Sequence, residues 1–249
     1  MRLAAFLTTV TLSACATYSS SFGRIERALA AREFDVALQE VEKQSGSRTD
    51  KVLYLLDRGM VLRMKGDFPG SNVALEGAKR EMERLYAKSV TENTLSFIVN
   101  DSTVSYVGDD YEQVMLHLYM ALNYLESGQV EEARVEALQA DVRLRELNEN
   151  IDGGKHAPDA FSRYLSAMIF EDLGEWSDAL IACRKAYQAY KDYPASYGLE
   201  MPATLKQDLL RLTRKMGLSE EAEKYKSEFG IDTPQKDDES GKSGSLVFI

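Results

Sequence analysis

The chain has 249 residues, with 40 acidic and 30 basic side chains and a formal net charge of −10 at pH 7. Nucleic acids and anionic lipid surfaces repel a protein of this charge, so we expect no nucleic-acid binding. Only two cysteines and two histidines are present, which excludes a disulfide framework and a structural zinc site, and we expect no cofactor or metal.

The N-terminus has the organisation of a secretion signal. Arg2 supplies a positive charge, and residues 3–12 form a mostly apolar run without charge. This run is too short to span a bilayer. Small residues, Ser13 and Ala14, then lead into Cys15, and this ending resembles a bacterial lipobox. We therefore predict a signal peptide that ends at Ala14, with an ordinary secretory signal and a chance cysteine as the alternative.

The lipobox resemblance implies that Cys15 becomes a mature N-terminus that carries a diacylglycerol and an N-acyl chain such as palmitate. Two or more acyl chains anchor a protein stably. Residues 15–22 are then the lipidated cysteine and a short tether. Ala16, rather than an aspartate, follows the cysteine. By the same resemblance this implies the outer membrane, with the protein facing the periplasm.

A short string recurs along the rest of the chain. It begins with a turn residue, continues with a polar and then an aromatic or apolar residue, and has Ala or Ser three positions later. Glycine in such a turn stops one helix, and the small residue lets the next helix approach closely. The strings begin at Arg32, Gly66, Gly128 and Gly174, and more weakly at Gly217.

These strings resemble tetratricopeptide repeats, and the 34 residues between Arg32 and Gly66 are one tetratricopeptide period. The resemblance predicts an all-α, tetratricopeptide-like α-solenoid of antiparallel helix pairs over residues 23–230. A helical bundle with coincidental glycine turns is the alternative. We expect the repeat units near residues 23–46, 52–87, 111–148, 160–192 and 203–229.

The later turns are more than 34 residues apart, which predicts insertions near residues 88–110, 148–158 and 193–202. The first is rich in β-branched and aromatic residues over 94–106, so we expect an apolar extended or hairpin segment between the second and third repeats. Residues 231–249 are expected to be mostly disordered. Their four apolar last residues are either a pairing strand or the start of a region beyond this chain.

Most of the chain also resembles a group of bacterial tetratricopeptide-repeat lipoproteins of the outer membrane. A stretch with Asn100, Asp101, Tyr106 and then Asp110, Tyr111 and Glu112 before the middle repeat supports this resemblance. The resemblance implies a repeat lipoprotein of the cell envelope but supplies no activity.

One polar constellation could carry catalysis. It comprises Asp101, Asp109, Asp110 and Glu112, with Tyr106 and Tyr111 nearby. Paired carboxylates act as general acid and base in glycosidases when burial separates their pKa values. However, Asp109 and Asp110 directly precede an expected helix, where acids cap the first turn. We favour the cap and expect no enzyme.

Three other sequence features favour structural roles. Residues 153–156 contain two glycines and a lysine, but they lack the first glycine and the Ser or Thr of a phosphate loop, so we expect a turn. His117 lies between leucines and is expected to pack in the core. Cys183 occupies a repeat position that is normally buried, which indicates a structural thiol.

In tetratricopeptide arrays, the first helix of each pair lines a partner-binding groove. The corresponding positions here are Leu56, Met60, Arg63 and Met64 in the second unit, Met115, Leu118, Leu122 and Leu125 in the third, and Tyr164, Met168 and Glu171 in the fourth. An exposed surface so rich in methionine needs a cover. Either a partner segment or the chain's own insertion at 94–106 could supply it.

We therefore expect a membrane-anchored scaffold or adaptor lipoprotein that binds other envelope proteins through its helical repeats, in outer-membrane or cell-envelope assembly. The alternative is a cell-wall-acting enzyme or glycan-binding protein that uses Asp101, Asp109 and Glu112. A third reading places partner recruitment on the outer face of the repeats or on the apolar C-terminus.

Overall fold

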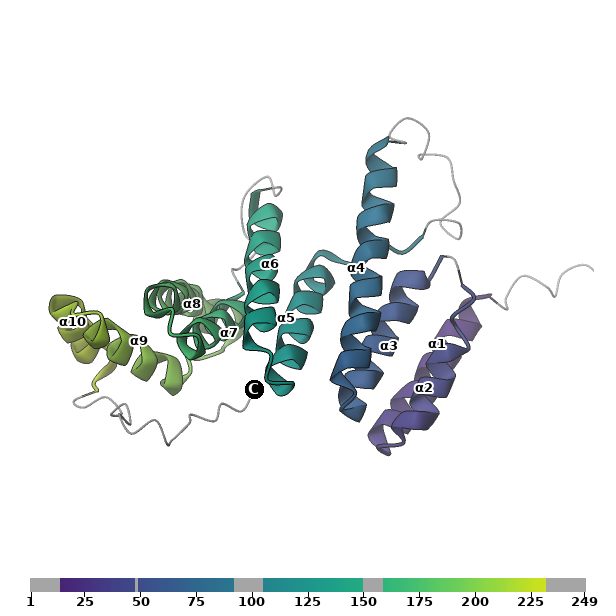
Figure 1. Cartoon of the computed structure of the whole chain (residues 1–249), viewed down its shortest axis with the longest axis horizontal. Coiled ribbons are helices and arrows are strands. Elements are labelled where there is room, and N and C mark those ends of the chain that lie inside the picture. The colour runs from purple at the N-terminus through teal and green to yellow at the C-terminus, as the bar shows by residue number, and fades with distance from the viewer. Residues whose placement is uncertain (1–13, 48, 92–104, 150–158, 232–249) are drawn as a thin grey trace, which may run out of the picture. The chain divides into compact units, whose positions relative to one another are not determined.

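The structure is a computed structural model that describes residues 14–47, 49–91, 105–149 and 159–231. All regular structure in these ranges is α-helical, which confirms the predicted fold class (Figure 1). The chain divides into two compact units, Met1–Gly128 and Gln129–Ile249. Each unit is described by itself.

The first unit contains five helices. They are α1 (Ala14–Ala30), α2 (Phe34–Glu42), α3 (Lys51–Lys65), α4 (Phe68–Thr91) and α5 (Asp110–Glu126). The first four form two helical hairpins, α1/α2 and α3/α4. Helix α2 packs against α3, and α4 packs against α5. The helices therefore follow one another in a stack.

The second unit continues with the same kind of element. Its helices are α6 (Val130–Glu149), α7 (Ala160–Asp172), α8 (Trp176–Tyr197), α9 (Ala203–Lys215) and α10 (Ser219–Phe229). Helices α7/α8 and α9/α10 form hairpins, while α6 packs on α7 and α8 packs on α9. The hairpin α9/α10 forms around Gly217, where the repeat pattern is weakest in sequence.

The turns inside the hairpins share one hydrogen-bonded design. Gly66 has a φ of 85°, and its N–H donates to the carbonyl of Arg63 at 2.9 Å. The N–H of Asp67 donates to the carbonyl of Leu62, also at 2.9 Å. This pair of bonds satisfies carbonyls that the end of a helix leaves open. The same pair recurs at Arg32, Gly174 and Gly217.

Arg32 is the exception in residue type. Its φ is 59°, and it is the one non-glycine residue with a positive φ in the described ranges. A side chain in this left-handed conformation costs about 1 kcal/mol relative to glycine. The first hairpin therefore adopts the repeat turn at an energetic cost that a glycine turn does not carry.

Small residues bring the two helices of a hairpin together. A Cβ atom on Gly59 of α3 would lie 2.7 Å from Cδ2 of Leu75 on α4, and Ser71 Oγ donates to the Gly59 carbonyl at 2.7 Å. Alanines of the hairpin helices and of α5 and α6 are also fully buried: Ala78, Ala121, Ala133, Ala140, Ala167, Ala179 and Ala186.

Two segments differ from the expected boundaries, and others lie outside the described residues. The expected tether, residues 15–22, belongs to α1 in the structure, since no glycine or proline precedes Gly23. Helix α8 continues through Pro194, within the expected insertion, until Gly198 ends it with a φ of 66°. The bulk of the first two insertions and the signal peptide lie outside the described residues, as does the tail.

The close approach at Gly59 gives a stability prediction. We expect Gly59→Ala to destabilise the protein by about 1–2 kcal/mol, because the new methyl group overlaps the buried Leu75 side chain. Gly77→Ala in α4 is the matched control, since its Cβ would lie 3.4 Å from Leu55, an ordinary contact. It should be neutral or stabilise by up to about 1 kcal/mol. Urea unfolding measures both, and equal effects would contradict the overlap.

Candidate functional site

A buried amide joins α3, α4 and α5 in the first unit. Asn123 is fully buried, and its Oδ1 accepts a hydrogen bond from Arg63 Nη1. Its Nδ2 donates to Ser71 Oγ at 2.8 Å and to Asn72 Oδ1 at 2.7 Å. The amide thus uses its oxygen and both its N–H groups inside the protein. Asn123 fixes the position of α5 on the preceding hairpin.

Arg63, a predicted groove residue, belongs to this hydrogen-bonded group, which we call the Asn123 anchor. Its guanidinium lies 5.9 Å from the ring centres of Phe68 and Tyr119, besides its bond to Asn123. Desolvation lowers the pKa of Arg63, although the charge of Glu126 opposes this effect. The structure therefore uses Arg63 to hold α3 and α5 together, and a partner can contact only the part that stays exposed.

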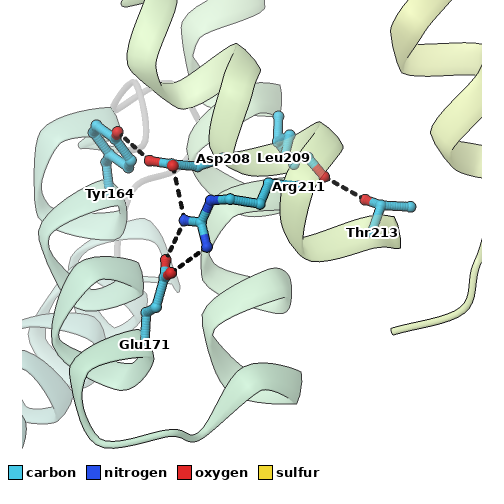
Figure 2. A network of polar contacts seen from close by, with 6 residues as sticks. All are labelled: Tyr164, Glu171, Asp208, Leu209, Arg211 and Thr213. Atoms are coloured by element: carbon cyan, nitrogen blue, oxygen red, sulfur yellow. Dashed lines mark hydrogen bonds and ion pairs between the residues drawn. The ribbon is translucent and has the colours of Figure 1, made fainter. Parts of the chain in front are cut away.

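A second anchor joins α7 and α9 in the other unit (Figure 2). Arg211 on α9 binds both carboxylate oxygens of Glu171 on α7, with Nη2 to Oε2 at 2.7 Å. The same nitrogen donates to Asp208 Oδ1 at 2.9 Å. Burial acts to lower the pKa of Arg211, but these hydrogen bonds and charges outweigh it and raise the pKa. A planar guanidinium on paired carboxylates is a strong, oriented contact.

Tyr164 extends this anchor into the core. Its hydroxyl donates to Asp208 Oδ2 at 2.6 Å (Figure 2). Burial, followed by the hydrogen bond to Asp208, raises the pKa of Tyr164. Cys183 lies in the same buried cluster, and burial together with the charges of Asp208 and Glu171 raises the pKa of its thiol. A thiol in this state is unreactive, in line with the predicted structural role.

The remaining groove positions divide by burial. Leu118 is fully buried and Tyr164 nearly so, which corrects their placement on a partner-facing surface: both side chains fill the interior of their units. Met64 is 48% exposed. The other apolar positions are partly exposed: Leu56, Met60, Met115, Leu122, Leu125 and Met168. The accessible part of the predicted groove is therefore smaller and more apolar than its sequence positions indicated.

The acidic stretch before α5 is a helix cap. Glu112 Oε2 accepts from the backbone N–H of Asp109 at 2.9 Å, and the two residues form a capping box. Glu112 also accepts a hydrogen bond from the Tyr106 hydroxyl. This confirms the predicted role of Asp109, whereas Asp101 lies outside the described residues. The N–H of Tyr106 donates to the Thr49 carbonyl at 2.9 Å, which ties the stretch to the loop before α3.

Sequence reasoning missed Asp57 on α3. Its Oδ2 is buried and has no hydrogen-bond partner among the described residues. Burial, together with the charge of Glu112, raises the pKa of Asp57 to about 6. A carboxyl with this pKa changes its protonation near neutral pH. Aspartate inside an amphipathic helix gives no sequence signal that separates such a buried group from an exposed one.

No group of three or more His, Cys, Asp or Glu side chains that could hold a metal ion occurs among the described residues. His117 is buried in α5, as predicted. Within the described ranges, no helix is long and apolar enough to cross a bilayer.

Comparison with known proteins identifies the fold. No family model matches the sequence, and no curated protein matches it. Three solved structures, each 14% identical in sequence, share the architecture. The apo form of RapI has a TM-score of 0.59, with 85% of this chain and 68% of that chain covered. MamA has a TM-score of 0.52, with 89% and 98% covered.

The third structure is a putative kinesin light chain from Podospora anserina with nearly identical TPR-like repeats. Its TM-score is 0.52, with 85% of this chain and 92% of that chain covered. Together with the hairpins and their turns, these similarities show that the chain has a tetratricopeptide-like repeat fold.

The Asn123 anchor should contribute strongly to stability. Asn123→Ala leaves the polar groups of Arg63, Ser71 and Asn72 without their amide partner, so we expect a loss of about 2–3 kcal/mol. Gln39→Ala, an amide removed from an exposed site on α2, should change stability by less than about 0.5 kcal/mol. Urea unfolding of both variants checks this, and a small effect at Asn123 would argue against the anchor.

Asp57 should make stability depend on pH. Its pKa in the folded protein exceeds the ordinary value of 3.8, so protonation favours folding. This contribution to the free energy of unfolding is fully present below about pH 4 and is lost as the pH rises through about 6. Its size is on the order of 2 kcal/mol. Asp57→Asn should therefore be more stable than the wild type at pH 7.5, and this advantage should be clearly smaller at pH 4.5 and absent below about pH 4. An advantage that is the same at both pH values would contradict the assignment.

Proposed function

We propose that this protein is a lipid-anchored adaptor of the cell envelope, facing the periplasm, which binds partner proteins through its helical repeats. The observation that carries the proposal is the tetratricopeptide-like stack, in which the first helices of the repeats leave apolar side chains within reach of a partner. Repeat folds of one kind bind many different partners, so the binding residues must be argued from the exposed side chains rather than from the fold.

We propose that the partner-binding surface of the first unit lies on α3 and α5. We call it the methionine surface and define it by the following residues: Leu56, Met60 and Met64 of α3, with Met115, Leu122 and Leu125 of α5. The bond between Arg63 and Asn123 places the two helices beside each other. Methionine adapts its shape to different ligands, and its exposure here supports recognition of apolar protein segments.

The N-terminus supports an anchor close to this domain. Cys15 lies at the start of α1, whose buried residues Ile25 and Ala28 pack in the first hairpin. The helical rise from Cys15 to Ile25 is only about 15 Å. An acylated Cys15 would therefore hold the repeats near a membrane, so the partners should also be membrane-proximal.

The alternative, an enzyme or glycan-binding protein of the cell wall, has less support. In the capping box of α5, the side chains of Asp109 and Glu112 each accept a hydrogen bond from the backbone N–H of the other residue. The Tyr106 hydroxyl also donates to Glu112. These contacts account for Asp109 and Glu112 without catalysis, because their carboxylates supply the two acceptors of a capping box.

The proposed lipid anchor is tested by replacing Cys15. We expect Cys15→Ser to move the protein from the membrane fraction to the soluble fraction without changing its helical content, because the fold does not depend on the lipid. Cell fractionation followed by circular dichroism of the released protein checks both points. A Cys15→Ser variant that stays membrane-bound after a high-salt wash would exclude the lipid anchor.

The binding role is tested by placing a charge on the methionine surface. Met64→Glu should reduce crosslinking of membrane-proximal partners by about tenfold or more, because a buried charge at an interface has no partner. Val73→Glu is the matched control, since Val73 is an exposed apolar residue on α4. Quantitative crosslinking from native membranes compares the variants, and equal losses would remove the methionine surface as the binding site.

A further inference from the structure

A short segment, Ser105–Asp109, ties the start of α5 to the loop before α3, and we call this segment the strap. The Tyr106 N–H donates to the Thr49 carbonyl at 2.9 Å, and the Tyr106 hydroxyl donates to Glu112. Glu112 also accepts from the Asp109 N–H in the capping box. The Glu112 carboxylate therefore binds the strap at both Tyr106 and Asp109.

Asp57 on α3 lies close enough to Glu112 to be affected by its charge. Its Oδ2 atom is buried and has no hydrogen-bond partner among the described residues. An ionised carboxylate needs hydrogen-bond donors or water, and it repels a second carboxylate nearby. Ionisation of Asp57 therefore raises the free energy of the arrangement in which the strap is bound.

The cations of α3 are bound to other groups. Arg58 Nε and Lys51 Nζ form ion pairs with acids of α2 and α4 at 2.8 and 3.2 Å, and Arg63 belongs to the Asn123 anchor. Within the described ranges, Asp57 Oδ2 thus receives no hydrogen bond from them. The elements around α3 contribute the following charged or titratable groups: Asp35 and Glu42 of α2, Glu81 and Arg84 of α4, Tyr106 and Asp109 of the strap, and Glu112, His117 and Glu126 of α5.

The strap is the neighbour of Asp57 that can leave at the lowest cost. Helices α2 and α4 pack against α3 as whole helices, whereas the strap is joined to the loop before α3 by the bond from Tyr106 to Thr49. Proteins open locally where few contacts hold a segment. Once Tyr106 is released, the Glu112 side chain can turn to water, and water can reach Asp57.

We propose that the protonation state of Asp57 controls the strap, which stays bound when Asp57 is protonated and is released more often when Asp57 is ionised. Tyr106 packs against the same buried cluster as Leu56, a member of the methionine surface. Release of the strap uncovers apolar side chains beside Leu56, so the binding surface is larger at neutral than at acidic pH. This last step rests on the proposed function, whereas the control of the strap does not.

Hydrogen exchange of the Tyr106 amide in the full chain tests the proposal. The pKa of Asp57 is about 6 with the strap bound and takes its ordinary value of 3.8 in water. Protonation therefore favours the bound strap, and this advantage is lost as the pH rises through about 6. We expect the protection factor of Tyr106, corrected for intrinsic exchange, to fall about tenfold between pH 5 and pH 7.5. Asp57→Asn should remove this change, whereas Glu83→Gln, at an exposed acid on α4, is the matched control and should keep it.

Two further variants test the strap if Asp57→Asn does not fold. Glu112→Gln keeps an oxygen that accepts hydrogen bonds but carries no charge, so the pH dependence should be weaker than in the wild type. Gly108→Ala should release the strap at both pH values. Gly108 has a φ of 87°, and a Cβ atom there would lie 2.6 Å from Met82 Cε. The Tyr106 amide should therefore have low protection in Gly108→Ala at pH 5 and at pH 7.5.

Low concentrations of urea separate release of the strap from unfolding of the whole protein. Release exposes little surface, so urea should hardly change the protection of Tyr106. The amide of Leu75, a fully buried residue of α4, exchanges through global unfolding, and its protection should fall as urea is added.

Partner crosslinking tests the effect of the strap on the methionine surface. Crosslinking to the wild type should be weaker at pH 5 than at pH 7.5, and it should be equal at the two pH values in Gly108→Ala. A pH dependence of crosslinking that is the same in both proteins would refute this effect.

Three results would overturn the control of the strap by Asp57. They are equal Tyr106 protection at pH 5 and pH 7.5, a pH dependence that persists in Asp57→Asn and so points to another group such as His117, and equal urea dependence of the Tyr106 and Leu75 amides. The proposed function is judged separately. Crosslinking that Met64→Glu removes, with pH-independent protection of Tyr106, would leave the methionine surface and refute the strap, and the opposite pair of results would do the reverse.

Discussion

The contact of two helix backbones at Gly59 and Ser71 sets the geometry of the hairpin α3/α4. The serine hydroxyl reaches the glycine carbonyl, and the Leu75 side chain of α4 packs directly against Gly59. Such an approach fixes the rotation of each helix about its axis, since any other rotation would bring large side chains into the gap. The rotation then decides which residues fill the core and which face outward.

The two polar anchors fix the position of one repeat relative to the next. Asn123 joins α5 to the preceding hairpin, and Arg211 joins α9 to α7. Each anchor connects first helices of successive repeats, so it controls the spacing of repeats rather than the spacing within a hairpin. Their partners include Arg63, Tyr164 and Glu171, three residues whose positions would otherwise suit ligand binding. In this chain those positions maintain the stack.

Much of the fold could be predicted because its signals are local. The turn strings place the hairpins, and the acids before α5 indicate a cap, since both patterns act within a few residues. The continuation of α8 through Pro194 was missed, because proline is a frequent but not a necessary end to a helix.

The site was predicted only in part because burial depends on contacts between distant segments. Leu118 and Met115 lie on the same expected helix face, yet only one of them is accessible. The ion pairs around Asp141 join residues on three helices, and the chain does not bring their positions together before folding. This group of ion pairs was therefore invisible in the linear pattern.

The left-handed Arg32 has a consequence for local opening. Its turn makes the same two hydrogen bonds as the glycine turns, so its conformational cost is not offset by any additional bond there. Native proteins open segment by segment, and a strained turn lowers the free energy that separates the closed and open forms. The backbone amides of Arg32 and Glu33 should accordingly exchange with solvent deuterium sooner than those of Gly66 and Asp67. The repeat array would then loosen first at the hairpin nearest to Cys15.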